Sequence, residues 1–201
     1  MFPNVDSVSS DKNLSPKEGV MSGDKISIIT AMANGRVIGY NNDLPWERIP
    51  WDFKNFKERT MDCPIIMGSK TFDSIIARTK KPLPGRYMIA VSRTRAPVQT
   101  NEYAIAPSIE QALDIAHRRT NGKGEIFIGG GSEIYQQTLP FVDRLYVTFI
   151  DADFPGDAYF PEIDFLSWKE VGIPPDTPPI QKGVNSPYNL RYTIFERKPH
   201  L

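Results

Sequence analysis

The sequence predicts a single α/β domain built on a largely parallel sheet, and three features lead to this fold class. The chain has 201 residues, which suffices for one domain with a full core and is short for two. Short apolar runs typical of buried strands recur along the chain, and segments of helical character lie between most of them. Strands that alternate with helices favour a parallel sheet covered on both faces.

The expected elements follow one another along the chain. The strand-like runs cover residues 26–31, 64–67, 87–91, 103–106, 126–128 and 145–150. The clearest helix covers residues 108–118, where Ser108 and Gln111 form a capping-box pattern before an apolar stripe of Ile109, Ala112, Leu113 and Ala116. The proline-rich stretch 173–187 predicts a surface loop, and the segments 168–171 and 189–196 beside it predict a closing antiparallel hairpin.

Composition narrows the class of protein. The 24 basic and 24 acidic residues cancel and are scattered, which argues against nucleic acid or an anionic membrane as a partner. A single cysteine, Cys63, excludes an internal disulfide and is typical of the cytoplasm. Residues 1–22 are polar and lack a signal-peptide core, so we expect a disordered extension before a domain at 23–201.

The inventory of reactive side chains excludes several chemistries. His117, on the predicted helix, and His200, near the end of the chain, are the only histidines, and both are expected at the surface. No G-x-S-x-G elbow is present, and with one cysteine and two histidines no metal site is expected. The sequence therefore predicts chemistry whose reactive atoms belong to a bound cofactor.

Three consecutive glycines, Gly129 to Gly131, join the predicted strand at 126–128 to a short helix from about Ser132. Bare glycine backbone can approach a pyrophosphate closely, and a helix start faces its negative charge. Ile134 stands where the dinucleotide fingerprint has its third glycine, so a Rossmann assignment is weak. A plain turn is the alternative, but it would need one glycine rather than three.

A second signal lies in the segment of residues 34–60. Pro50 suits the first position of a helix, which places Asp52 in the first turn beside Trp51, Phe53 and Phe56. A carboxylate among these rings is poorly solvated, which favours a functional role. The alternative is that Asp52 only interacts favourably with the helix dipole. The preceding glycines and asparagines, Gly35, Gly39, Asn41 and Asn42, predict a long mobile loop that could close over a site.

Hydroxyl and basic residues follow the ends of two predicted strands. Ser69, Lys70 and Thr71 come after one strand, and Ser92 and Arg93 come after the next. Ligands in open α/β sheets bind at the carboxyl ends of strands, so these residues could hold a phosphate. Solvated turns explain the same spacing equally well.

Taken together, these segments closely resemble the dihydrofolate reductase family from Ile26 to about Lys198. The resemblance rests on RVIGYNNDLPW, IPWDFKNFK, IIMGSKTFDSI, PLPGR, IGGGSEIY, LYVTFIDAD and GDAYFP, in this order. It implies an eight-stranded, mostly parallel sheet with one antiparallel edge strand and four main helices. It also implies reduction of 7,8-dihydrofolate to tetrahydrofolate by NADPH, which supplies one-carbon metabolism and thymidylate synthesis.

The resemblance also implies roles for individual residues. The catalytic group would be Asp52 with Leu44 and Trp46, and Asp52 would hold the pterin edge with support from Thr148. Arg86 would clamp the substrate's α-carboxylate, Phe56 would pack on its aminobenzoyl ring, and Ile29 and Lys81 would complete the substrate site. Gly130 and Gly131 would be joined by a cis peptide. The cofactor site would comprise Ala31, Val37, Ile38, Gly39, Tyr40, Asn41, Asn42, Asp43, Lys70, Thr71, Ser92, Arg93, Gly130, Gly131, Ser132, Glu133, Ile134, Tyr135 and Gln137.

The chain departs from the family pattern at four places. Six positions separate Trp46 from Asp52, a spacing like the vertebrate enzymes, whereas the aspartate is like the bacterial ones. Ser69 stands where many members carry a basic residue for the 2′-phosphate, and Lys81 stands where a second arginine is common. Gly129 replaces a bulkier aliphatic residue.

Two other functions stay open at this point. The reductase of riboflavin biosynthesis shares the fold and cofactor, although PLPGR and the Asp52 segment speak against it. A non-catalytic pterin or nucleotide sensor on the same domain is the other alternative, and an intact Asp52 argues against it. The expected partners are dihydrofolate and antifolate inhibitors, and the expected assembly is a monomer.

Overall fold

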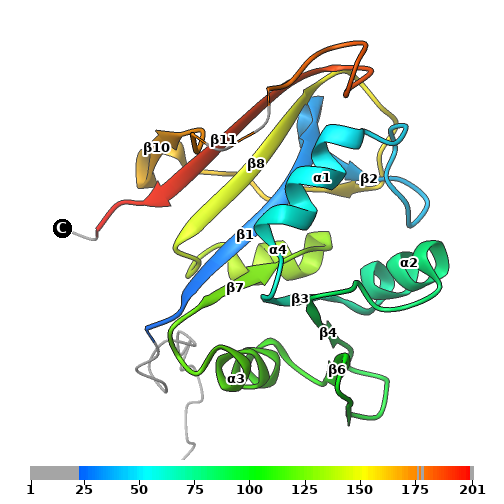
Figure 1. The fold of residues 1–201 in the computed structure, drawn as a ribbon, viewed down its shortest axis with the longest axis vertical. Helices are drawn as coiled ribbons and strands as arrows, with labels where there is room; N and C mark the ends of the chain where they lie inside the picture. The colour runs from blue at the N-terminus through cyan, green and yellow to red at the C-terminus, as the bar shows by residue number, and fades with distance from the viewer. Residues whose placement is uncertain (1–22, 176, 178, 200–201) are drawn as a thin grey trace, which may run out of the picture.

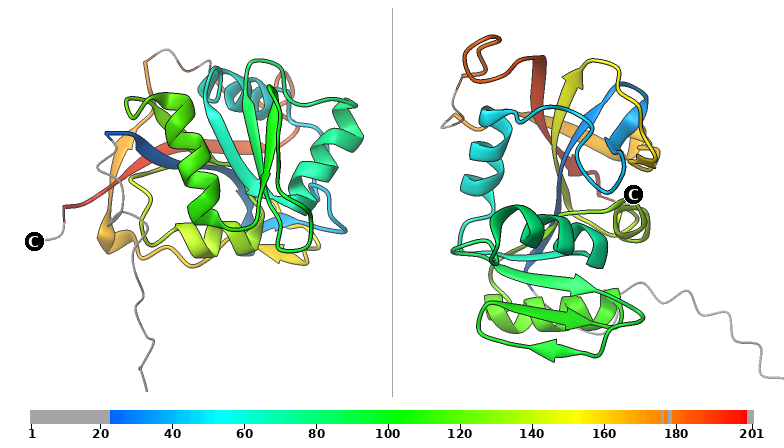
Figure 2. Two further views of the ribbon diagram at one scale, coloured as in Figure 1. Left: turned by 90° about the horizontal axis from the view of Figure 1, so that it is seen from below. Right: turned by 90° about the vertical axis from the view of Figure 1, so that its right-hand side faces the viewer.

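The computed structural model describes residues 23–175, 177 and 179–199, which form one twisted sheet with helices on both faces (Figures 1 and 2). The strand order is β10-β11-β8-β1-β7-β3-β4-β6-β5. The six strands from β8 to β6 are parallel, as the alternation of strands and helices predicts. β11 runs antiparallel to β8 and pairs with β10 in the predicted closing hairpin.

All six predicted strand runs are strands of this sheet, and the fold class is confirmed. The sheet has nine strands because the two-residue β5 pairs antiparallel with β6 at the far edge, where the sequence shows no strand signal. The strands are β1 Lys25–Ala33, β3 Pro64–Gly68, β4 Tyr87–Val91, β5 Val98–Gln99, β6 Tyr103–Ala106, β7 Glu125–Ile128, β8 Arg144–Asp151, β10 Trp168–Gly172 and β11 Asn189–Arg197.

Four helices cover the sheet: α1 Pro50–Arg59, α2 Ser69–Thr79, α3 Ile109–Thr120 and α4 Ser132–Thr138. The predicted cap of α3 is present, since the Ser108 hydroxyl accepts a hydrogen bond from the Gln111 amide at 3.3 Å. Short 3-10 turns occur at Asn34–Arg36 and Phe165–Ser167. No helix in the described part of the chain is long and apolar enough to cross a membrane.

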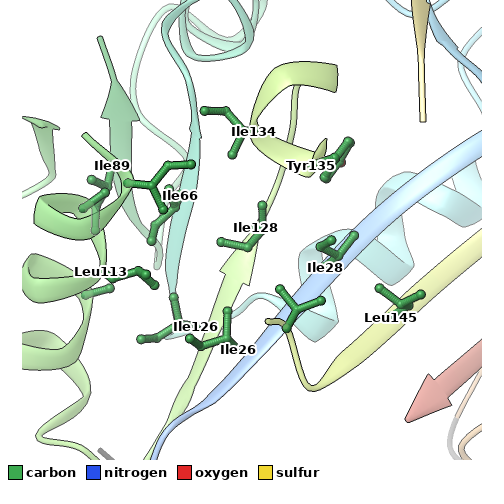
Figure 3. Close-up of a cluster of buried hydrophobic side chains, with 14 of the residues drawn as sticks. Ile26, Ile28, Ile66, Ile89, Leu113, Ile126, Ile128, Ile134, Tyr135 and Leu145 are labelled. Carbon is green, nitrogen blue, oxygen red and sulfur yellow. The ribbon is translucent and has the colours of Figure 1, made fainter. Parts of the chain in front are cut away.

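Each face of the sheet carries its own hydrophobic core. On one face, α3 and α4 pack their apolar stripes on the strands. Figure 3 shows Leu113 of α3 and Ile134 and Tyr135 of α4 against the isoleucines of β1, β3, β4 and β7. On the other face, α1 contributes Trp51 and α2 contributes Phe72 to a cluster that includes Ile65 and Met67 of β3. The two-sided burial explains why the strands are apolar without alternation.

The segment predicted as one long mobile loop is partly ordered. Residues 34–36 form a 3-10 turn, and β2 Val37–Gly39 pairs with β9 Ala158–Tyr159 in a small second sheet. Too short for a periodic signal, these two strands could not be predicted. The expected extension at 1–22 lies outside the described residues, and so does His200.

His117 has a structural role, although we expected it at the surface. Its side chain is only 16% exposed, and its Nδ1 lies 2.6 Å from Oδ2 of the buried Asp24. The same carboxylate accepts hydrogen bonds from the Thr120 hydroxyl and the Gly124 amide. His117 therefore ties the end of α3 to the residue before β1, at the edge of the sheet where the parallel strands begin.

Candidate active site

The loops that follow β3, β4 and β7 lie side by side because these strands are neighbours and run parallel. The topology thus brings the two hydroxyl and basic clusters, Ser69 to Thr71 and Ser92 to Arg93, to the same edge of the sheet as the three glycines. This is the edge at which open α/β sheets bind their ligands. The fold therefore favours a shared site over independent solvated turns.

The glycines form a tight cradle against β3 and α2. The Gly130 carbonyl accepts a hydrogen bond from the Gly68 amide at 2.7 Å, and the peptide between Gly130 and Gly131 is cis. A Cβ on Gly130 would lie 3.3 Å from the Tyr135 hydroxyl, and its φ of 112° is one that other residues rarely adopt. A Cβ on Gly131 would lie 3.3 Å from the Thr71 Oγ1. Side chains would fill this space, so the glycines keep bare backbone exposed to a ligand.

Exposed cations rim the cradle. Lys70 lies in the first turn of α2, and Arg93 follows β4 and forms an exposed ion pair of 3.3 Å with Glu133 at the start of α4. Such a pair is weak in water, so Arg93 can readily change partner. Ser92 is buried, and its hydroxyl accepts a hydrogen bond from the Arg95 amide at 3.2 Å. Arg95 itself pairs with Asp73 of α2 through contacts of 2.9 and 2.5 Å.

Asp52 lies in the first turn of α1, as predicted. Pro50 is the first residue of that helix, and Trp51 beneath it is buried. Desolvation raises the pKa of Asp52 from 3.8 to about 6, and a hydrogen bond with the Thr148 side chain lowers it by less. The carboxyl group therefore titrates close to neutral pH, as a group that exchanges protons with a ligand should.

Tyr135 links the cradle to the acid. Its hydroxyl donates a hydrogen bond of 2.9 Å to the Ile29 carbonyl, and desolvation together with the charge of Asp52 raises its pKa. Ile29 and Ala31 lie on β1, and Ala31 is opposite the buried Thr148 of β8. Ile29, Ala31 and Thr148 thus form the floor between the two halves of the site.

Arg86 is the third charged component. The turn before it requires a glycine, since Gly85 has φ 72° and a Cβ there would lie 2.5 Å from the Met61 sulfur. One Arg86 Nη lies 3.5 Å from the Lys57 carbonyl, whereas the Nε is buried without a hydrogen-bond partner within the described residues. Desolvation lowers the pKa of Arg86. A buried, unsatisfied guanidinium donor beside α1 is suited to an anionic ligand.

Of the remaining substrate residues, one lies on α1 and one lies after α2. Phe56 is half-buried on α1, one turn after Asp52, and contributes to the core on that face. Lys81 is exposed in the connection after α2. The structure therefore brings Asp52, Phe56, Thr148 and Ile29 together and leaves Lys81 at the rim.

The loop of residues 40–46 is held at both ends. The Asp157 carboxylate accepts a hydrogen bond of 3.0 Å from the Asn41 amide, and the Asp157 amide donates one of 3.0 Å to the Gly39 carbonyl. The Asp43 carboxylate pairs with Arg78 of α2. Trp46 is buried and packs on Phe154, whereas Leu44 is 37% exposed. The structure thus places Asp43 toward α2 and Trp46 in the core.

Three residues of this region were not singled out from the sequence. Asp157 lies in GDAYFP, a motif that carries the resemblance but suggested no role. Arg95 lies two positions after Arg93, and its spacing after β4 could have indicated it. Arg78 has no local sequence signal, because its contact with Asp43 joins segments that are far apart in the chain.

Bare glycine backbone at the carboxyl edge of a parallel sheet, together with a desolvated carboxyl group of raised pKa, is typical of a reductase that takes its hydride from a bound nucleotide. Comparisons with known proteins place the chain more narrowly. The family model described as dihydrofolate reductase matches residues 25–197. The chain therefore belongs to the dihydrofolate reductase family, and its activity is that of this family.

Individual relatives agree with this assignment. The chain is 40% identical over 174 residues to the dihydrofolate reductase of Bacillus subtilis, and the alignment covers 86% of this chain and 95% of the relative. It is 38% identical over 176 residues to that of Staphylococcus haemolyticus, covering 86% and 96%. A solved structure of Enterococcus faecalis dihydrofolate reductase, complexed with NADP(H) and RAB-propyl, matches with a TM-score of 0.72 and 30% identity, covering 89% and 98%.

Proposed function

We propose that this chain reduces 7,8-dihydrofolate to tetrahydrofolate with NADPH, and that Asp52 supplies the acid function. The observation that carries the proposal is the Asp52 carboxyl group, whose pKa is raised to about 6 by desolvation. A spectrophotometric assay that follows the loss of NADPH with dihydrofolate tests it. Turnover with a pyrimidine ribityl substrate instead would favour the riboflavin-pathway reductase, and binding without turnover would favour a sensor.

The residues of the cradle fit a dinucleotide. The backbone at Gly130 and Gly131 can approach a pyrophosphate, because neither residue has a side chain to obstruct it. Thr71 lies beside Gly131. Lys70 and Arg93 would hold a 2′-phosphate, assisted by the hydroxyls of Thr71 and Ser92. When bound, the nicotinamide supplies the hydride. The protein's contribution is to position the ring on the floor of Ile29 and Ala31 and to exclude water beneath the loop at 37–43.

The substrate half of the site orients the pterin and its tail. Asp52 would accept two hydrogen bonds from the amidine-like edge of the pterin, while Thr148 fixes the carboxyl group. Asp52 is protonated below its pKa of about 6 and ionised above it, so it can hold or pass on the proton that N5 receives. Arg86 would bind the α-carboxylate with its planar fork, since its Nε has no partner among the described residues. Phe56 would pack on the aminobenzoyl ring.

The setting of the enzyme follows from the same features. We place it in the cytoplasm as a monomer, with antifolate inhibitors competing at the Asp52 subsite. The free thiol of Cys63 is consistent with a reducing compartment.

Cofactor choice gives a further prediction. Replacing both Lys70 and Arg93 with glutamine should raise the Michaelis constant for NADPH about tenfold or more, because NADPH differs from NADH only by the phosphate that these cations would bind. The constant for NADH should barely change. The preference should also weaken with added salt, because Arg93 and Lys70 are exposed. Steady-state kinetics with both cofactors measures each effect.

Arg95→Gln is the matched control, because this nearby cation already pairs with Asp73. Its effect on the NADPH preference should be smaller than that of the double substitution. Equal use of both cofactors by the wild type, or equal weakening of both by the double substitution, would show that the phosphate is held elsewhere.

A further inference from the structure

The loop between β10 and β11 extends along α1, the helix that carries Asp52. Figures 1 and 2 show this loop above the amino-terminal end of α1. At that end, the Asn185 carbonyl accepts a hydrogen bond of 3.0 Å from the Trp51 amide. At the other end, Arg59 donates a hydrogen bond of 3.1 Å to the Thr177 hydroxyl. The loop therefore contacts both ends of the helix.

The contact at Trp51 takes the place of a normal helix cap. Helices usually satisfy their first amides with the side chain of a serine, threonine, aspartate or asparagine at the N-cap position. Here the N-cap residue is Ile49, which makes no side-chain cap, and Pro50 has no amide hydrogen to donate. A carbonyl from a distant loop thus caps the amide of the residue immediately before Asp52.

The Asn185 side chain holds that carbonyl in place. Its Oδ1 accepts a hydrogen bond from the Gln181 amide at 2.8 Å, and its Nδ2 donates one to the Pro179 carbonyl at 2.9 Å. Two backbone hydrogen bonds, from Asn185 to the Gln181 carbonyl and from Gly183 to the Ser186 carbonyl, tighten the same turn. The side chain therefore closes a compact loop whose outward carbonyl faces α1.

The hairpin also supports Trp51 from the sheet. Tyr192 of β11 packs edge-on against the Trp51 ring, with 5.3 Å between the ring centroids. In the antiparallel register, Tyr192 lies directly opposite Thr148 of β8, the residue that hydrogen-bonds Asp52. Trp51 is thus fixed by the loop at its amide and by β11 at its ring. The residue that contacts the ring, Tyr192, is paired across the sheet with the residue that hydrogen-bonds Asp52, Thr148.

We propose that Asn185 is a positioning residue for Asp52, acting through the loop carbonyl that caps the Trp51 amide and fixes the first turn of α1 against β8 and β11. This inference rests on the proposed acid role of Asp52. In this arrangement the start of the helix is fixed by the hairpin and not by a local side-chain cap.

Asn185→Ala tests this proposal. Hydrogen exchange at the Trp51 amide, measured by NMR, should become faster because the side chain no longer holds the carbonyl that caps this amide. The value of kcat/KM for dihydrofolate at neutral pH should fall about three- to tenfold, the effect of weakening the hydrogen bond that caps the Trp51 amide. Its pH profile should break at lower pH than in the wild type, because a looser first turn hydrates Asp52. The dissociation constant for NADPH should not change, since the cradle lies on other elements.

Two further variants make the result specific. Val184→Ala is the control, because this neighbouring side chain is 76% exposed and its loss leaves the Asn185 contacts intact. Asn185→Asp keeps the acceptor for the Gln181 amide and loses the donor to Pro179, so it should fold and show a smaller effect. The proposal would be overturned if Asn185→Ala showed faster Trp51 exchange but wild-type kinetics, or if its Trp51 exchange were unchanged. It would also be overturned if Val184→Ala had an equal effect. Full activity in Asp52→Asn would instead contradict the acid role, whatever the exchange at Trp51 shows.

Discussion

Asp52→Asn should lower the turnover of dihydrofolate by about 10²–10⁴-fold at neutral pH, the range that a lost general acid produces. Asparagine keeps the shape and the contact with Thr148 but cannot donate or accept the proton. The fold and the affinity for NADPH should remain nearly intact, because the cradle is built on other elements than α1. Diaminopyrimidine antifolates should bind much more weakly, since their protonated ring loses its carboxylate partner. Single-turnover hydride transfer and inhibitor titration measure both effects.

The same substitution should stabilise the protein without ligand. The pKa of Asp52 is raised in the folded state to about 6. Its favourable contribution to the free energy of unfolding is therefore complete below pH 3.8 and is lost as the pH rises through about 6. Asparagine has no such loss, and the variant should be more stable at neutral pH by about 1–3 kcal/mol. Urea unfolding at two pH values checks the sign, because the gain should nearly vanish near pH 4. A variant less stable than the wild type at neutral pH would show that Asp52 is not desolvated.

Arg86→Leu should raise the Michaelis constant for dihydrofolate about 100-fold, with a smaller effect on kcat. The Nε atom of Arg86 is buried without a hydrogen-bond partner among the described residues, and the substrate carboxylate would supply that partner. Arg86→Lys should restore only part of the affinity, because an ammonium group lacks the planar fork. Steady-state kinetics with dihydrofolate measures both variants.

A dihydropteridine without the glutamate tail is the matched control substrate. It has no carboxylate for Arg86, so wild type and Arg86→Leu should use it with similar Michaelis constants. An equal loss on both substrates would mean that Arg86 supports the pocket as a whole and does not bind the tail.

Local pattern predicted most of the fold and part of the site. The buried strands, the capped helix α3 and the position of Asp52 in the first turn of α1 follow from apolar periodicity, capping residues and proline placement, which act over a few residues. Resemblance was needed to give Arg86 and Thr148 roles, because nothing in their spacing indicates which ligand they face.

Contacts between distant segments could not be predicted. Asp43 lies against Arg78, Asp157 holds the Asn41 amide, and the Asn185 carbonyl caps the Trp51 amide. The residues of each pair lie on different elements and at least 35 positions apart in the chain. Such contacts are fixed only when the sheet brings its loops together. The structural role of His117 was missed for the same reason, because its partner Asp24 lies before β1.

The pH dependence of kcat/KM for dihydrofolate tests the acid role of Asp52 most directly, because this ratio reports the ionisation of the free enzyme. In the wild type it should be constant at acid pH, break near 6, and fall about tenfold per pH unit above the break. In Asp52→Asn the break near 6 should be absent. A wild-type profile without this break, or an Asp52→Asn variant that retains it, would contradict the assignment of Asp52 as the acid.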